Sequence, residues 1–256
     1  MLFFRAVLPY AASFLTFIFF ELLYQWPHAL FVSSILLLLG LSAILFFLLG
    51  TNLTTPLSRL QFMITPLTLI GTTYAFILFI PTTSLYHIFA LIPSLILLLY
   101  FYFLYNYVWR HDHYIPFSLE HTASYASIIS LFFLTGSLSA AHIFLAVSII
   151  PLTILFGLIV TVLTAHTVWM NKFSFQETKY IITMTALMLT EFFIAALFLP
   201  IPFLTTAAFL AILGYGVWEY MRHMLLKTLS PRIISRHAIY GTILLGVLLI
   251  TASWTI

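Results

Sequence analysis

Ionisable side chains are rare inside the apolar segments of this chain, and they are its first candidates for chemistry. Glu191 lies in the predicted span 178–199, roughly 12 Å from one end at a rise of 1.5 Å per residue. Met188 and Leu187, three and four residues before it, offer no hydrogen bond, so its partner must come from another helix or from water. Glu191 could therefore bind a proton or a cation, or it could join two helices as a neutral, hydrogen-bonded acid.

A second carboxylate and two histidines are expected on the same side of the membrane as Glu191. Glu21 lies at a similar depth in the first span, and His87 and His142 are expected to begin the fourth and sixth spans. If the helices bring these four side chains together, they would line a polar pocket that could move protons or hold a metal through imidazole and carboxylate groups. The alternative is that both histidines are ordinary residues of the membrane interface.

A weaker cluster lies in the connection that follows the fourth predicted span. His111, Asp112 and His113 form a His-x-His pattern with an acidic centre, and Glu120 and His121 follow a few residues later. Such residues could ligate a metal ion. The alternative is an interfacial loop in which Glu120 stabilises the start of the next helix, where a negative charge is favourable.

Other signatures of catalysis are missing from the sequence. There are no cysteines, which excludes disulfides, thiolate metal sites and iron–sulfur clusters. There is no nucleophile motif, no zinc-protease motif and no phosphate-binding loop. Glu219 and Arg222 are three residues apart at a predicted helix end, so we expect an ion pair. No catalytic residue, metal site or cofactor is assigned.

The elements that must position these residues are membrane-spanning helices. The chain of 256 residues is 63% hydrophobic and only 6% charged, and a helix needs about 20 apolar residues to cross a bilayer. We predict an all-α, polytopic transmembrane helical bundle that forms a single membrane domain over residues 1–256. Its nine spans are expected at residues 6–25, 29–50, 61–80, 84–106, 118–138, 142–165, 178–199, 203–221 and 235–254.

The basic residues predict how these spans cross the membrane. All nine lysines and arginines fall before the first span, in every second connection, or at the second residue of the span that follows such a connection: Arg5, Arg59, Arg110, Lys172, Lys179, Arg222, Lys227, Arg232 and Arg236. Cytoplasmic loops carry the excess of Lys and Arg, so the N-terminus is expected inside and the C-terminus outside. Because these residues are scattered singly at helix ends, they predict contact with lipid headgroups and no binding of nucleic acid.

Two spans have a distinctive residue composition. The fifth carries small residues four apart, Ala123 with Ser127 and Ala126 with Ser130, which predicts close packing on its neighbours. The fourth carries a run of aromatic residues over 100–107, which we expect to face lipid and the membrane interface.

Three stretches resemble a known group of sequences: residues 114–120 (YIPFSLE), residues 189–200 around Glu191, and the ending 249–254 (LITASW). They resemble a family of uncharacterised multi-span membrane proteins of candidate-phyla-radiation (patescibacterial) bacteria. The resemblance implies a location in a bacterial inner membrane. It implies no activity and no functional residue.

Two kinds of function fit these observations, and neither is an enzyme. One is a small transporter-like protein that uses an intramembrane carboxylate, and the other is a membrane scaffold or assembly subunit that needs only packing surfaces. The alternative is a membrane-embedded enzyme that acts on a lipid. The expected partners are membrane lipids together with a membrane-protein partner or a second copy of the chain.

Overall fold

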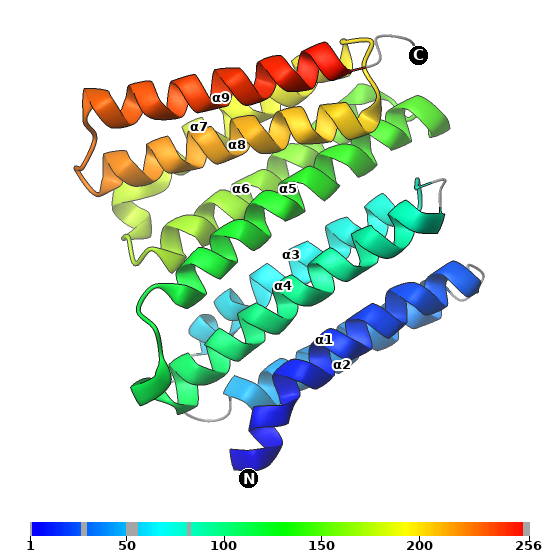
Figure 1. Cartoon of the computed structure of the whole chain (residues 1–256), viewed down its shortest axis with the longest axis vertical. Helices are drawn as coiled ribbons and strands as arrows, with labels where there is room; N and C mark the ends of the chain where they lie inside the picture. The colour runs from blue at the N-terminus through cyan, green and yellow to red at the C-terminus, as the bar shows by residue number, and fades with distance from the viewer. Residues whose placement is uncertain (1, 27–29, 50–55, 81–82, 253–256) are drawn as a thin grey trace. The chain divides into compact units, whose positions relative to one another are not determined.

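The structure is all-α, as predicted. The computed structural model describes residues 2–26, 30–49, 56–80 and 83–252, and within these ranges it contains nine α-helices, one 3-10 helix (η2) and no strand (Figure 1). The helices are α1 (Leu2–Gln25), α2 (Leu30–Leu49), α3 (Pro56–Ile77), α4 (Thr83–Trp109), η2 (His111–His113), α5 (Ser118–Leu145), α6 (Ile149–Met170), α7 (Phe175–Leu197), α8 (Phe203–Leu225) and α9 (Pro231–Thr251).

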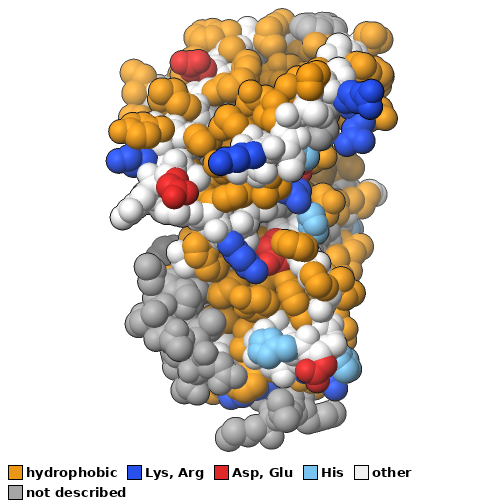
Figure 2. Space-filling model, turned by 90° about the vertical axis from the view of Figure 1, so that its left-hand side faces the viewer, with side chains coloured by type: hydrophobic (Ala, Val, Ile, Leu, Met, Phe, Trp, Pro, Cys, Tyr) orange, Lys and Arg blue, Asp and Glu red, His pale blue; other side chains and the backbone are white. Residues whose placement is uncertain are grey.

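Eight of these helices, all except α2, are long and apolar enough to cross a membrane. In α2, the stretch Gly40–Leu49 is apolar but is shorter than a membrane span. Large hydrophobic side chains such as Ile150 and Tyr180 are exposed, as a lipid-facing surface requires. Figure 2 shows hydrophobic side chains over most of one face, with Lys and Arg scattered among them. The chain is therefore an integral, multi-pass membrane protein. The outermost residues of the predicted second and ninth spans (29, 50, 253 and 254) lie outside the described residues.

The chain forms two compact units, residues 1–126 and 127–256. In unit 1, α1 packs against α2 and α4, and α3 packs against α4. The prediction that the aromatic run of α4 faces lipid is wrong for Tyr100, Phe101 and Tyr105, which are buried. The Tyr100 hydroxyl donates a hydrogen bond of 2.8 Å to the carbonyl oxygen of Phe62 on α3, and this bond explains how a tyrosine can be buried.

In unit 2, α6, α7 and α8 pack in sequence, and α9 pairs with α8 as a hairpin. The core of this unit includes Leu131 of α5 and the stacked rings of Phe156 and Phe193, whose centroids are 4.2 Å apart. The basic connections α6–α7 and α8–α9 lie at the same end of this unit, on the left in Figure 1, which is the arrangement that successive membrane crossings produce. The four small residues of α5 (Ala123, Ala126, Ser127 and Ser130) are buried, as expected.

Candidate functional site

Glu21 and His87 form the ionisable pair of unit 1. Glu21 lies one turn before the end of α1 and His87 one turn after the start of α4, so the packing of these helices brings the two together. The Nδ1 atom of His87 is 2.9 Å from Oε1 of Glu21. Their side chains are 43% and 25% exposed, respectively. A carboxylate and an imidazole at this distance are in hydrogen-bonding contact, and both remain accessible from outside the helix pair.

Aromatic side chains hold the pair in place. The ring of Tyr24 lies 5.5 Å from that of His87 and 4.9 Å from that of Tyr86. The Tyr86 hydroxyl donates a hydrogen bond of 2.6 Å to the carbonyl oxygen of Phe20, which clamps α4 onto α1 beside Glu21. The geometry therefore fixes the backbone on both sides of the pair.

The opposite end of the same two helices carries a cation. The guanidinium carbon of Arg5 lies 3.7 Å from the ring centroid of Trp109, which is the contact distance of a cation–π interaction. Arg5 stands near the start of α1 and Trp109 ends α4. The helix pair is thus polarised, with the carboxylate–imidazole pair at one end and the guanidinium at the other.

Glu191 lies in α7 of unit 2, and its side chain is exposed. The adjacent Thr190 points elsewhere: its hydroxyl donates to the carbonyl oxygen of Ala186 and lies over Gly157 of α6. Within the described part of unit 2, Glu191 makes no side-chain hydrogen bond or ion pair. Its expected role as a proton or cation ligand stays a prediction.

The position of His142 differs from the expectation that it begins the sixth span. The fifth helix continues past residue 138 to Leu145, so His142 lies in the last turn of α5. Ala146 then reverses the chain with a left-handed φ of 51°, and the Nδ1–H of His142 donates to the carbonyl oxygen of Val147 at 2.9 Å. Within unit 2, His142 therefore binds the backbone of the turn that follows its own helix. The four-residue pocket stays a prediction, because its members divide between the two units.

The loop cluster after α4 splits into exposed and buried residues. His111, Asp112 and His113 form the exposed turn η2, and His121 is also exposed. Glu120 is buried in the first turn of α5, where its Oε2 accepts a hydrogen bond of 2.6 Å from the hydroxyl of Tyr114. Burial, together with this bond and the charge of Glu120, raises the pKa of Tyr114 above its ordinary value of 10.0. The contact holds the loop against the start of α5, and the expected role of these residues as metal ligands stays a prediction.

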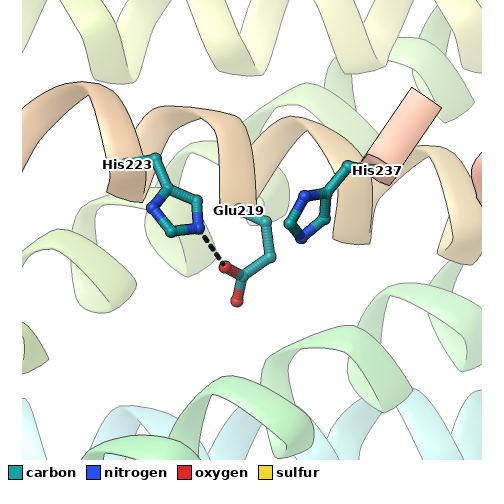
Figure 3. A group of neighbouring side chains, drawn as sticks. All are labelled: Glu219, His223 and His237. Carbon is teal, nitrogen blue, oxygen red and sulfur yellow. Dashed lines mark ion pairs between the residues drawn. The ribbon is translucent and has the colours of Figure 1, made fainter. Parts of the chain in front are cut away.

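A third group lies in the α8–α9 hairpin. The predicted ion pair is confirmed, since Nη1 of Arg222 is 3.4 Å from Oε1 of Glu219. The other oxygen of Glu219, Oε2, lies 3.8 Å from Nε2 of His223, and His237 of α9 faces both (Figure 3). Each of Glu219, His223 and His237 offers a potential metal ligand, and these atoms all lie within 4.8 Å of one another. In the described part of the chain, no other set of three or more such residues is grouped in this way.

The sequence analysis missed His223 and His237. The signal for His223 was available, because Glu219 and His223 are four residues apart and so share one helix face. His237 could be added only by recognising that residues 226–230 form a turn tight enough to return the chain onto that face. No family model, curated protein or solved structure matches this chain.

Proposed function

We propose that this integral membrane protein is transporter-like and that the Glu21–His87 pair is its proton-binding group. The observation that carries the proposal is the 2.9 Å contact between His87 Nδ1 and Glu21 Oε1 across two membrane helices. Ionisable groups within membrane segments are costly and are retained chiefly where they bind or relay ions. Glu21 is a better choice than Glu191 because it has a basic partner that can pass a proton to it and take one back.

The exposure of the pair supports the same proposal. Both side chains are partly accessible, so a proton can reach them without the helices separating. The packing of Tyr24 and Tyr86 limits the side-chain motion of the pair. Proton exchange at Glu21 would therefore change the charge at one end of the α1–α4 contact, where it can bias how these helices pack.

Proton flux into liposomes tests this proposal. Purified protein is reconstituted with a pH-sensitive dye inside, and an inward proton gradient is imposed together with a potassium–valinomycin potential. We expect wild-type flux above that of protein-free liposomes. Glu21→Gln and His87→Phe should reduce the proton flux to the rate of protein-free liposomes, because each variant removes one of the two groups proposed to bind the proton.

Two matched variants make the result specific. Glu191→Gln removes an exposed intramembrane carboxylate, and His121→Ala removes an exposed histidine; both should keep wild-type flux. Loss of flux in Glu191→Gln with retention in Glu21→Gln would overturn the assignment of the pair. Wild-type flux no faster than that of protein-free liposomes would overturn transport itself and leave the scaffold as the better reading.

We further propose a bacterial cytoplasmic membrane, with the N-terminus inside. The resemblance at residues 114–120 and 189–200 supports the location, and the basic residues in alternate connections support the orientation. Fusions of alkaline phosphatase and a fluorescent protein to the C-terminus test the orientation. Phosphatase activity without fluorescence is expected, and the reverse pattern would contradict it.

A further inference from the structure

The α8–α9 hairpin is built so that three metal-ligating side chains converge. Glu219 and His223 stand on one face of α8, and His237 lies in the second turn of α9. The side chains of Glu219 and His223 are 22% and 24% exposed, and all three residues are half-buried. The group is therefore shielded by the hairpin but still reachable from outside.

The turn between α8 and α9 fixes the position of His223. The carbonyl oxygen of His223 accepts the backbone N–H of Thr228, and that of Met224 accepts the N–H of Lys227. Lys227 has a left-handed φ of 56°. This is the Schellman arrangement that ends many helices. It brings the hydroxyl of Thr228 to 3.0 Å from Nδ1 of His223.

The contact with Thr228 orients the imidazole. With Nδ1 occupied by Thr228, the other ring nitrogen, Nε2, faces Oε2 of Glu219 at 3.8 Å. This separation is too long for a hydrogen bond. Ligand atoms about 2.0–2.2 Å from a tetrahedral metal are roughly 3.4 Å apart, so Nε2 and Oε2 are close to the spacing of two ligands of one ion.

The two carboxylate oxygens of Glu219 contact different partners. Arg222 bonds Oε1 of Glu219. This leaves Oε2 for the imidazole side, where Figure 3 shows the contact between Glu219 and His223. A metal-binding carboxylate or imidazole is commonly held by such a second hydrogen bond on the atom that does not bind the metal. Arg222 and Thr228 thus occupy the outer atoms of the two ligands on α8.

We propose that Glu219, His223 and His237 form a binding site for a borderline divalent cation, with Zn²⁺ as the representative ion. Two imidazoles and one carboxylate suit Zn²⁺ and its first-row neighbours, whereas Mg²⁺ and Ca²⁺ prefer all-oxygen ligands and Cu⁺ prefers sulfur. The sequence had suggested metal binding at other residues and no such role for Glu219, His223 and His237. The proposal is independent of the Glu21–His87 pair.

Three protein ligands leave a fourth position for water or another ligand. His223 and His237 also line a groove of about 310 Å³ between α8 and α9, which is otherwise mainly apolar, with Leu213, Val217 and Leu245 among its walls. A bound ion would join the two helices, because its ligands come from both. This makes the hairpin a metal-stabilised element.

Zinc binding to the full chain tests the proposal. The protein is purified in detergent through a tag without histidines, treated with a chelator and titrated with Zn²⁺ alone by calorimetry. We expect one Zn²⁺ per chain and a melting temperature that rises with Zn²⁺. Glu219→Gln and His237→Ala should weaken binding by more than roughly 100-fold, and Thr228→Val by roughly 10- to 100-fold, the usual effect of losing an orienting bond.

Controls separate this site from general histidine binding and from misfolding. His113→Ala removes an exposed histidine in another loop and should bind as the wild type does. Each variant must keep the wild-type melting temperature without metal, and Glu219→Gln keeps the size of the side chain. Visible absorption of bound Co²⁺ provides a second readout and should be lost in His223→Gln. Absence of stoichiometric Zn²⁺ binding, or equal affinity in Glu219→Gln, His237→Ala and the wild type, would overturn the proposal.

Discussion

The side chain of Leu131 on α5 fills the space next to the Cα of Gly214 on α8, so that a methyl group at residue 214 would overlap with it. Leu131 is fully buried, so it can make room for a methyl group only by repacking against its neighbours in the core. Gly216, two residues further along α8, has open space at the corresponding position among the described residues. One glycine is therefore needed for helix packing and the other is not.

We predict that Gly214→Ala destabilises the protein by about 1–3 kcal/mol, the usual result of overpacking a buried contact. Gly216→Ala should be neutral or stabilising by up to about 1 kcal/mol, since alanine favours the helix. Thermal unfolding in detergent measures both. Equal melting temperatures of the two variants would contradict the close packing of α5 on α8.

We predict that Tyr114→Phe destabilises the protein by about 1 kcal/mol at neutral pH, because the buried carboxyl of Glu120 loses the hydrogen bond from Tyr114. The loss is expected to be smaller than for a fully buried charged bond, because Tyr114 is partly exposed. Denaturation in detergent at pH 7 measures the difference. Tyr125→Phe is the control, since Tyr125 is exposed, and it should have no effect.

The same pair predicts an alkaline dependence. The pKa of Tyr114 is raised in the folded state, so above the ordinary value of 10.0 the unfolded chain loses the phenol proton first. The contribution of Tyr114 to stability is therefore fully present below pH 10 and is lost as the pH rises above it. The stability difference between wild type and Tyr114→Phe should be constant from pH 7 to about pH 9 and shrink beyond pH 10. A difference that grows with pH would contradict this sign.

The fold could be predicted because long apolar runs have few alternatives in a membrane. Hydropathy does not say which side of a helix meets another helix, since lipid and protein interiors are similarly apolar. For this reason the buried Tyr100 was expected at the lipid surface, although its bond to Phe62 holds it inside.

The sites were harder to predict, for two physical reasons. The position of Glu21 along its helix does not reveal which other helix lies beside it. The contact with His87 arises only because α1 packs against α4. The end of α5 depended on a left-handed Ala146, a conformation that alanine seldom adopts. The sequence therefore gave no signal that α5 ends after His142 and not before it. By contrast, the Glu219–Arg222 pair was predicted because both residues lie on one helix, where spacing alone decides contact.

Lys227 gives a direct test of the turn that carries His223. We predict that Lys227→Gly is more stable than Lys227→Ala by about 1 kcal/mol, because glycine accepts the left-handed φ of 56° without steric cost. The two variants lose the same charge and the same long side chain, so their difference reports the backbone alone. Thermal unfolding measures it, and a more stable alanine variant would contradict the Schellman geometry.

Trp218 of α8 and Thr164 of α6 form the most informative polar contact inside unit 2. The indole N–H donates a hydrogen bond of 3.1 Å to the threonine hydroxyl, and both residues are buried. Interhelical hydrogen bonds in membrane proteins average about 0.6 kcal/mol and reach about 1.7 kcal/mol. We predict a coupling in this range for the double-mutant cycle of Trp218→Phe and Thr164→Val, measured by unfolding in detergent or bicelles. Because Trp218→Phe also removes packing volume, only the coupling, and not the loss in either single variant, measures the bond. Strictly additive losses would show that the indole and the hydroxyl do not interact.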